Sequence, residues 1–191
     1  MTTTIYLLRH GEVHNPQGVI YGALPGYRLS EFGRAEVNIA AETLAAHSPF
    51  DALIASPLER AQESAAIVGR RLELTPVVEP RLAETEVTGY QGQPFSALPS
   101  PYITEDGVRG IEGAASMRAR MIDWVASARQ HERVIAVSHR DPIAVLLLHW
   151  MGAGLARLGE LTVPTGSLHE ARLDGGGVEL SGPGWGEPGR A

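Results

Sequence analysis

Short apolar runs alternate with longer segments of helical period along the chain. Residues 5–8, 52–55 and 134–137 are continuously apolar, as strands are when helices cover both faces of a parallel sheet. A fourth candidate strand covers residues 168–173. Strands that alternate with helices are typical of an α/β domain with a largely parallel central sheet, and we expect that fold class here.

Helical spacing fills the gaps between these runs. Ser30 is a candidate N-cap for a segment that extends to about residue 47, and its apolar spacing predicts an amphipathic helix. The expected apolar stripe of that helix consists of Phe32, Val37, Ile39, Ala40 and Leu44. A further helix is expected over residues 114–130.

Two other helices carry proline near their expected starts. Ser56, Pro57 and Glu59 match an N-cap serine, an N1 proline and an N3 glutamate, so we predict a capping box and a helix that runs through residue 71. Asp141 and Pro142 repeat the pattern of an N-cap and an N1 proline. They predict a very apolar, buried helix over residues 143–151.

Two segments lack a regular period. Residues 84–113 contain three prolines and several glycines, so we expect a long irregular excursion, and such loops often act as functional lids. Residues 182–191 are rich in glycine and proline and are expected to form a mobile or loosely docked tail. The preceding residues, 1–181, are expected to form a single domain.

Composition excludes several kinds of chemistry. All 16 basic side chains of the 191 residues are arginine, and there is no cysteine, so lysine nucleophiles, P-loop lysines, disulfides and cysteine-ligated metals are excluded. The net charge of −6 disfavours a general binder of nucleic acids or anionic membranes. The first apolar run is stopped by Arg9 and is too short for a signal peptide or membrane span, so we predict a cytoplasmic protein.

Basic and proton-carrying side chains follow the predicted strands. Arg9 and His10 come directly after the first strand, His139 follows the strand at 134–137, and Arg60 falls in the first turn of the helix after the strand at 52–55. The carboxyl ends of parallel strands share one edge of a sheet, where α/β proteins bind ligands. Arginines and histidines around one point suit a phosphoryl dianion.

Four short motifs in a fixed order add a resemblance to a known family. They are RHGE at 9–12, SPLERA at 56–61, RLAE at 81–84 and VSH at 137–139. In order and spacing the chain resembles the histidine phosphatase (phosphoglycerate mutase-like) superfamily from about residue 4 to residue 173. The resemblance implies a three-layer α/β/α sandwich with a mostly parallel central sheet.

The resemblance also implies a role for each main site residue. His10 would attack phosphorus and form a phosphohistidine, while Arg9, Arg60 and His139 would bind the phosphoryl oxygens. Glu84 would protonate the leaving oxygen and then activate water as a general base. No metal or other cofactor is implied.

Several other residues are further candidates for the site. Asn15 resembles the family's phosphate-contacting asparagine but lies one position closer to the histidine than in the common spelling of the motif. Arg140 stands where many relatives have glycine, and it is expected to contact phosphate or a second anionic group. Tyr21, on the expected pocket rim, could select a leaving group or merely order its loop. Glu112 and Arg120 resemble a later G-E-S…R segment in which Gly113 replaces the serine.

The function we expect is a metal-independent phosphomonoesterase of the histidine acid type. Its expected partner is a small-molecule phosphomonoester; nucleic acid and membrane are not expected, and a homodimer is left open. One alternative is a phosphoglycerate mutase. The resemblance implies, however, that mutases of this superfamily have longer chains, with an added segment that closes over the site, and this chain is short for that. Another is a non-catalytic scaffold on the same fold, which would be expected to have lost one of the main site residues.

Overall fold

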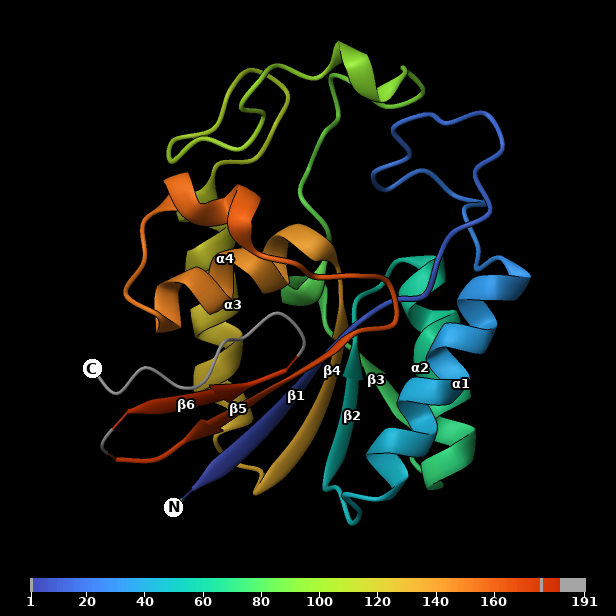
Figure 1. Ribbon diagram of the computed structural model, residues 1–191, viewed down its shortest axis with the longest axis vertical. Coiled ribbons are helices and arrows are strands. Elements are labelled where there is room, and N and C mark those ends of the chain that lie inside the picture. The colour runs from blue at the N-terminus through green and yellow to red at the C-terminus, as the bar shows by residue number, and fades with distance from the viewer. Residues whose placement is uncertain (1, 176, 183–191) are drawn as a thin grey trace.

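One mixed sheet forms the centre of the protein, whose computed structural model describes residues 2–175 and 177–182 (Figure 1). The strand order is β3-β2-β4-β1-β5-β6. Pairs β3–β2, β2–β4 and β4–β1 are parallel, whereas β5 and β6 run antiparallel to their neighbours. The strands are β1 (Thr3–Arg9), β2 (Ala52–Ala55), β3 (Pro76–Val78), β4 (Arg133–Ser138), β5 (Leu168–Leu173) and β6 (Val178–Ser181). The predicted, mostly parallel sheet is confirmed.

Both strands that the sequence analysis missed lie at the edges of the sheet. β3 has three residues and begins with Pro76, and its Val77 and Val78 are 56% and 53% exposed. β6 alternates half-buried and exposed residues and pairs only with β5. Neither strand is buried on both faces, so neither has the continuous apolar run that identifies the central strands.

Helices cover both faces of the sheet, which gives the three layers that were expected. The α-helices are α1 (Glu31–Ala45), α2 (Glu59–Leu72), α3 (Ala114–Ala128) and α4 (Arg140–Trp150), and the 3₁₀ helices are η1 (Pro80–Leu82), η2 (Phe95–Ala97) and η3 (Leu155–Glu160). Figure 1 shows α1 and α2 on one face and α3 and α4 on the other. Neighbouring β1 residues face different layers, because Leu7 packs with α3 and α4 and Leu8 with α1 and α2. Within the described residues, no helix has both the length and the apolar composition needed to cross a membrane.

The first helix begins as expected, and Val37, Ala40 and Leu44 of its predicted stripe are buried. Ser30 is its N-cap and accepts a hydrogen bond from the Gly33 N–H. Phe32 and Ile39 were predicted to be in the stripe, yet they are 63% and 70% exposed. Seven residues apart, they share one side of the helix, and that side faces solvent.

The predicted capping box at Ser56 is wrong. α2 begins later, with Leu58 as N-cap and without a side-chain cap. The Ser56 hydroxyl lies 2.6 Å from His139 Nε2, and the Glu59 carboxylate accepts hydrogen bonds from the Gly26 N–H and from Arg28. Contacts with distant parts of the chain have replaced the local cap.

The start of α4 also differs from the prediction. His139 is the N-cap residue, so Asp141 and Pro142 lie inside the first turn. The Asp141 carboxylate does not cap the helix, because it accepts hydrogen bonds from Thr85 and Tyr102. The helix itself is buried from Asp141 to Leu148, as expected.

The irregular excursion at 84–113 is confirmed, and the 3₁₀ helix η2 is its only helix. Its apolar side chains Val87, Ile103 and Ile111 form a small core of their own with residues of α3 and α4. In Figure 1 this green and yellow segment lies beyond the same end of the sheet as the blue segment that follows β1. Of the predicted tail, residues 183–191 lie outside the described residues.

A contact between two glycines fixes the chain that follows His10. A Cβ atom on Gly33, in the first turn of α1, would overlap the Glu12 carbonyl oxygen, and one on Gly11 would overlap the Gly33 carbonyl oxygen. Neither neighbour can rotate away, because both are backbone groups. The two glycines therefore hold α1 directly against the segment that carries His10.

We predict that Gly33→Ala destabilises the protein, although alanine normally stabilises a helix relative to glycine by about 1 kcal/mol. The overlap should cost about 1–3 kcal/mol net, measured as a lower midpoint in urea or thermal unfolding. Gly159→Ala is the control, because a Cβ atom at Gly159 meets no atom within 4 Å. Equal stability of the two variants would show that this backbone contact is unimportant.

Candidate active site

The carboxyl ends of β1 and β4 bring His10 and His139 together. The two strands are parallel neighbours, and Arg9 is paired with Ser138. The ring centroids of His10 and His139 are 4.9 Å apart, and neither residue is more than 1% exposed. The expectation that these strand ends converge is confirmed.

Hydrogen bonds define the tautomer of His10. Its Nδ1 lies 2.7 Å from the Gly11 carbonyl oxygen, which can only accept, so Nδ1 carries the proton. The lone pair is then on Nε2, to which Arg60 Nε donates at 3.2 Å. Burial and the nearby Arg60 charge hold the pKa of His10 well below its ordinary value. The ring is therefore neutral, with its nucleophilic nitrogen facing Arg60.

Two guanidinium groups lie beside this imidazole, that of Arg60 buried and that of Arg9 half-buried. Arg60, on α2, is 1% exposed, and its second terminal nitrogen has no hydrogen-bond partner in the described part of the chain. Arg9 donates to the Val163 carbonyl at 2.6 Å, while its Nε is buried and unpartnered there. Among the described residues, no carboxylate forms an ion pair with either arginine. Buried cations without anionic partners are costly, so this arrangement favours binding of an anion.

His139 presents a third buried polar atom. The Ser56 hydroxyl accepts a hydrogen bond from the Leu58 N–H and forms a second hydrogen bond with His139 Nε2 at 2.6 Å. The other ring nitrogen, Nδ1, is a buried atom without a hydrogen-bond partner among the described residues and lies 3.9 Å from Glu84 Oε2. Burial, followed by the Arg60 charge, holds the pKa of His139 well below its ordinary value.

Glu84 supplies a carboxyl group beside the two histidines. Its side chain is 19% exposed, and its Oε1 accepts a hydrogen bond from the Thr85 N–H at 2.9 Å. Burial and the charge of Asp141 raise the pKa of Glu84 to about 7, against the opposing effect of Arg60. Near neutral pH this carboxyl is therefore present in both protonation states.

Polar contacts to the preceding turn hold Glu84 in place. Ser138 Oγ donates to the Leu82 carbonyl at 2.8 Å, and Arg120 donates to the Arg81 carbonyl at 2.6 Å. Arg120 also forms a two-point ion pair with Glu112. Arg120 thus joins the two ends of the excursion.

The remaining predicted site residues have varied surroundings. Tyr21 lies at the site, with the Arg60 guanidinium 4.8 Å from its ring centroid and Tyr27 stacked on it at 5.0 Å. The side-chain amide of Asn15 donates to the Val19 carbonyl and accepts from the Val19 N–H, which braces the loop. Arg140 is paired with Asp141 at 2.7 Å. The structure thus gives Asn15 and Arg140 partners other than a ligand.

Two residues at the site were missed by the sequence analysis. Ser64 Oγ accepts from the Gly11 N–H at 3.3 Å and donates to the Arg60 carbonyl at 2.8 Å, so it links the loop after β1 to α2. Ser64 could have been predicted at the site from its position four residues after Arg60, which places it on the same face of the helix. Asp141 was interpreted only as a helix cap, and nothing in its local sequence reveals its contacts with Thr85 and Tyr102.

His10, Glu84 and His139 also form the kind of group that can hold a metal ion. One ligand atom from each lies within 4.8 Å of the others. However, a cation there would stand beside Arg9 and Arg60, whose charges already repel protons from both imidazoles. The local charge therefore fits an anion better than a metal ion.

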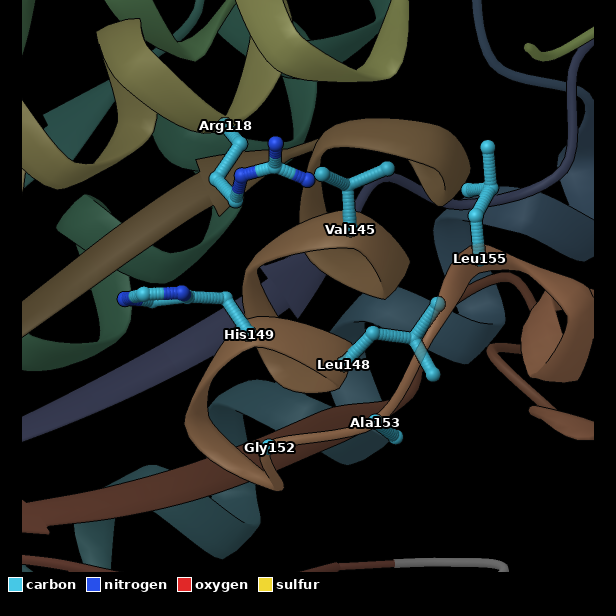
Figure 2. Close-up of a pocket in the computed structure, with 7 residues that line it drawn as sticks. All are labelled: Arg118, Val145, Leu148, His149, Gly152, Ala153 and Leu155. Atoms are coloured by element: carbon cyan, nitrogen blue, oxygen red, sulfur yellow. The ribbon is translucent and has the colours of Figure 1, made fainter. Parts of the chain in front are cut away.

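A separate hollow of about 190 Å³ lies between α3, α4 and η3. Figure 2 shows its lining side chains, which include Arg118 of α3, Val145 and His149 of α4, and Leu155 of η3. None of the histidine, arginine and glutamate side chains at the sheet edge lines it. Arg118 is already paired with Glu105, so this hollow does not share the chemistry of the site.

Comparison with known sequences gives one consistent family. A sequence model described as the histidine phosphatase superfamily (branch 1) matches residues 5–185. A Mycobacterium tuberculosis protein named "Uncharacterized protein Rv0525" is 34% identical over 166 residues, which cover 80% of this chain and 81% of that protein. The glucosyl-3-phosphoglycerate phosphatase of M. tuberculosis is 36% identical over 163 residues, with coverage of 74% and 72%.

Solved structures agree with these sequence matches. The protein YhfR of Bacillus stearothermophilus superposes with a TM-score of 0.82 at 24% identity, over 95% of this chain and 96% of that one. At this level of identity the similarity shows the fold alone, an α/β sandwich with the same central sheet.

We predict that inorganic phosphate stabilises the protein through Arg60. At tenfold excess over its dissociation constant, phosphate should contribute about 1.4 kcal/mol and raise the melting temperature by about 3–6 °C. Arg60→Met should lose this response and be at least as stable as the wild type without phosphate, because a buried cation is removed.

Arg71→Met provides the matched control for this melting experiment. Arg71 lies on the same helix, is half exposed and is paired with Glu42, so the variant should keep the full response to phosphate. An undiminished response in Arg60→Met would show that the anion binds elsewhere.

Proposed function

The chain belongs to the histidine phosphatase superfamily, and we propose that it hydrolyses a small organic phosphomonoester, without a metal ion, through a phosphohistidine on His10. One observation carries the proposal: the buried, unpaired guanidinium nitrogens of Arg9 and Arg60 flank a neutral imidazole. These groups match the charge of a phosphoryl dianion and leave the nucleophile unprotonated.

In the first step, His10 Nε2 attacks phosphorus in line with the leaving oxygen. A P–N bond forms as the P–O bond breaks, and the proton of Glu84 passes to the leaving alkoxide. N–H groups of Arg9, Arg60 and His139 stabilise the charge on the phosphoryl oxygens.

In the second step, the Glu84 carboxylate accepts a proton from water. The water oxygen attacks phosphorus, the P–N bond breaks, and inorganic phosphate leaves. His10 returns to its neutral form and Glu84 to its protonated form, so the cycle balances. A pKa of about 7 allows one carboxyl to serve both steps.

The raised pKa of Glu84 supports an acid-type phosphatase. The first step needs the protonated carboxyl, so its rate should fall as the pH rises above about 7. A substrate with a poor leaving group should show this fall most clearly, because its alkoxide needs the proton.

The proposed substrates are small phosphate esters. One relative is named glucosyl-3-phosphoglycerate phosphatase, and another, from Salmonella typhimurium, adenosylcobalamin/alpha-ribazole phosphatase. Sugar phosphates, nucleotides, phosphoglycerates and α-ribazole phosphate are therefore the first compounds to assay. A cytoplasmic location and a homodimer belong to the same proposal and can be tested by cell fractionation and by sizing.

A panel of these esters tests the function. We expect inorganic phosphate to be released equally with and without a chelator, and a phosphoenzyme that is labile in acid to be trapped by rapid quenching in base. His10→Ala should lower kcat by at least about a thousandfold, since the displacement loses its nucleophile. His131→Ala, at the opposite end of β4, should leave kcat unchanged.

Three outcomes would contradict the proposal. Loss of activity with chelator would contradict the metal-free mechanism, and full activity of His10→Ala would remove the nucleophile assignment. Isomerisation of 3-phosphoglycerate to its 2-isomer without phosphate release would identify a mutase instead.

A further inference from the structure

Asp141 is a second buried carboxyl group near the site, and the proposed mechanism does not use it. It lies in the first turn of α4, two residues after His139, and is 6% exposed. The α4 N-terminus favours a negative charge at this position. A buried carboxylate needs hydrogen-bond partners to offset the cost of its desolvation. The partners of Asp141 therefore indicate its role.

The contacts of Asp141 connect three separate segments. Thr85 Oγ1 donates to Oδ2 at 3.2 Å, and the Tyr102 hydroxyl lies 2.9 Å from Oδ1 and 2.8 Å from Oδ2. Arg140 donates to Oδ1 at 2.7 Å. Thr85 directly follows Glu84, while Tyr102 belongs to the middle of the excursion. Asp141 therefore links Thr85, at the start of the excursion, and Tyr102, in its middle, to α4.

Thr85 transmits this contact to the carboxyl of Glu84. Its backbone N–H donates to Glu84 Oε1 at 2.9 Å while its hydroxyl is held by Asp141. Thr85 is 3% exposed, so it has little freedom to turn. Any shift of Thr85 would move the donor that orients the Glu84 side chain.

We propose that Asp141 is a positioning residue, which holds Thr85 and Tyr102 so that Glu84 faces the leaving group. This inference rests on the proposed function, because the proposed mechanism makes Glu84 the proton donor to the leaving group. A structural clamp without this role would affect all substrates alike. A residue that positions the proton donor should matter most for substrates whose leaving group needs a proton.

The charge of Asp141 has a second consequence for the same carboxyl. After burial, Asp141 is the largest influence that raises the pKa of Glu84. The other titratable or charged groups that face Glu84 are Arg9 of β1, Tyr21 of the loop after it, Arg60 of α2, Tyr102 of the excursion, and His139 and Arg140 at the start of α4. Removing the negative charge leaves the arginines less opposed, so the pKa of Glu84 should fall.

Asp141→Asn tests the proposal with little change in shape. For a sugar or glycerol phosphate, whose leaving group is a poor one, kcat should fall about tenfold or more. For p-nitrophenyl phosphate, whose leaving group needs no proton, kcat should fall less than about threefold. KM should be nearly unchanged for both, because Arg9 and Arg60 are intact. The alkaline limb of the kcat profile for the sugar phosphate should move to lower pH.

Asp106→Asn is the matched control. It makes the same chemical change at an exposed position of the same excursion, and it should leave both rates and the pH profile as in the wild type. If Asp141→Asn does not fold, Tyr102→Phe takes its place, because it removes only one donor to Asp141. A lower ratio of sugar phosphate to p-nitrophenyl phosphate turnover in Tyr102→Phe would support the proposal, and an unchanged ratio would overturn it.

A measurement without substrate separates this inference from the proposed function. Carbon-13 NMR of labelled glutamate carboxyls, with the Glu84 signal assigned by its loss in Glu84→Gln, should give a midpoint near 7 in the wild type. In Asp141→Asn the midpoint should be clearly lower. An unchanged midpoint, or equal slowing of both substrates, would overturn the role of Asp141. A wild-type protein without phosphatase activity would overturn the proposed function alone.

Discussion

Burial of the Arg60 guanidinium beside the His10 imidazole is the interaction on which the site depends. The guanidinium is 1% exposed and donates to His10 Nε2, while one of its terminal nitrogens has no partner in the described part of the chain. Together with burial, its charge keeps the imidazole unprotonated and makes binding of an anion favourable. The same charge acts on His139 and limits the rise in the pKa of Glu84.

The fold brings these groups together by ordinary features of a parallel sheet. β1 and β4 end at one edge, so residues about 130 positions apart become neighbours. The Gly11–Gly33 contact and Ser64 hold the chain after His10 against α1 and α2. On the other side of the site, Arg120 joins both ends of the excursion that carries Glu84.

Features that depend on regular geometry can be predicted from the sequence. Predictions become less accurate where contacts with distant residues compete with local patterns such as helix caps. The central strands and the meeting of His10 with His139 follow from apolar runs and strand polarity, and both were found. Ser56 and Asp141 match helix caps by local pattern, but the structure engages them with His139 and with Thr85 and Tyr102 instead. A local pattern cannot reveal such partners, because they come from other segments of the chain.

Nitrogen-15 NMR of the histidine side chains measures whether burial and the Arg60 charge keep the His10 ring neutral. We predict that His10 stays neutral, with its proton on Nδ1, through the pH range around 6.5 in which an ordinary histidine becomes protonated, because burial and Arg60 oppose the charged ring. In Arg60→Met the ring should take up a proton at higher pH than in the wild type. Titration of the wild-type His10 ring near the ordinary histidine pKa of 6.5 would show that burial and Arg60 do not keep it neutral.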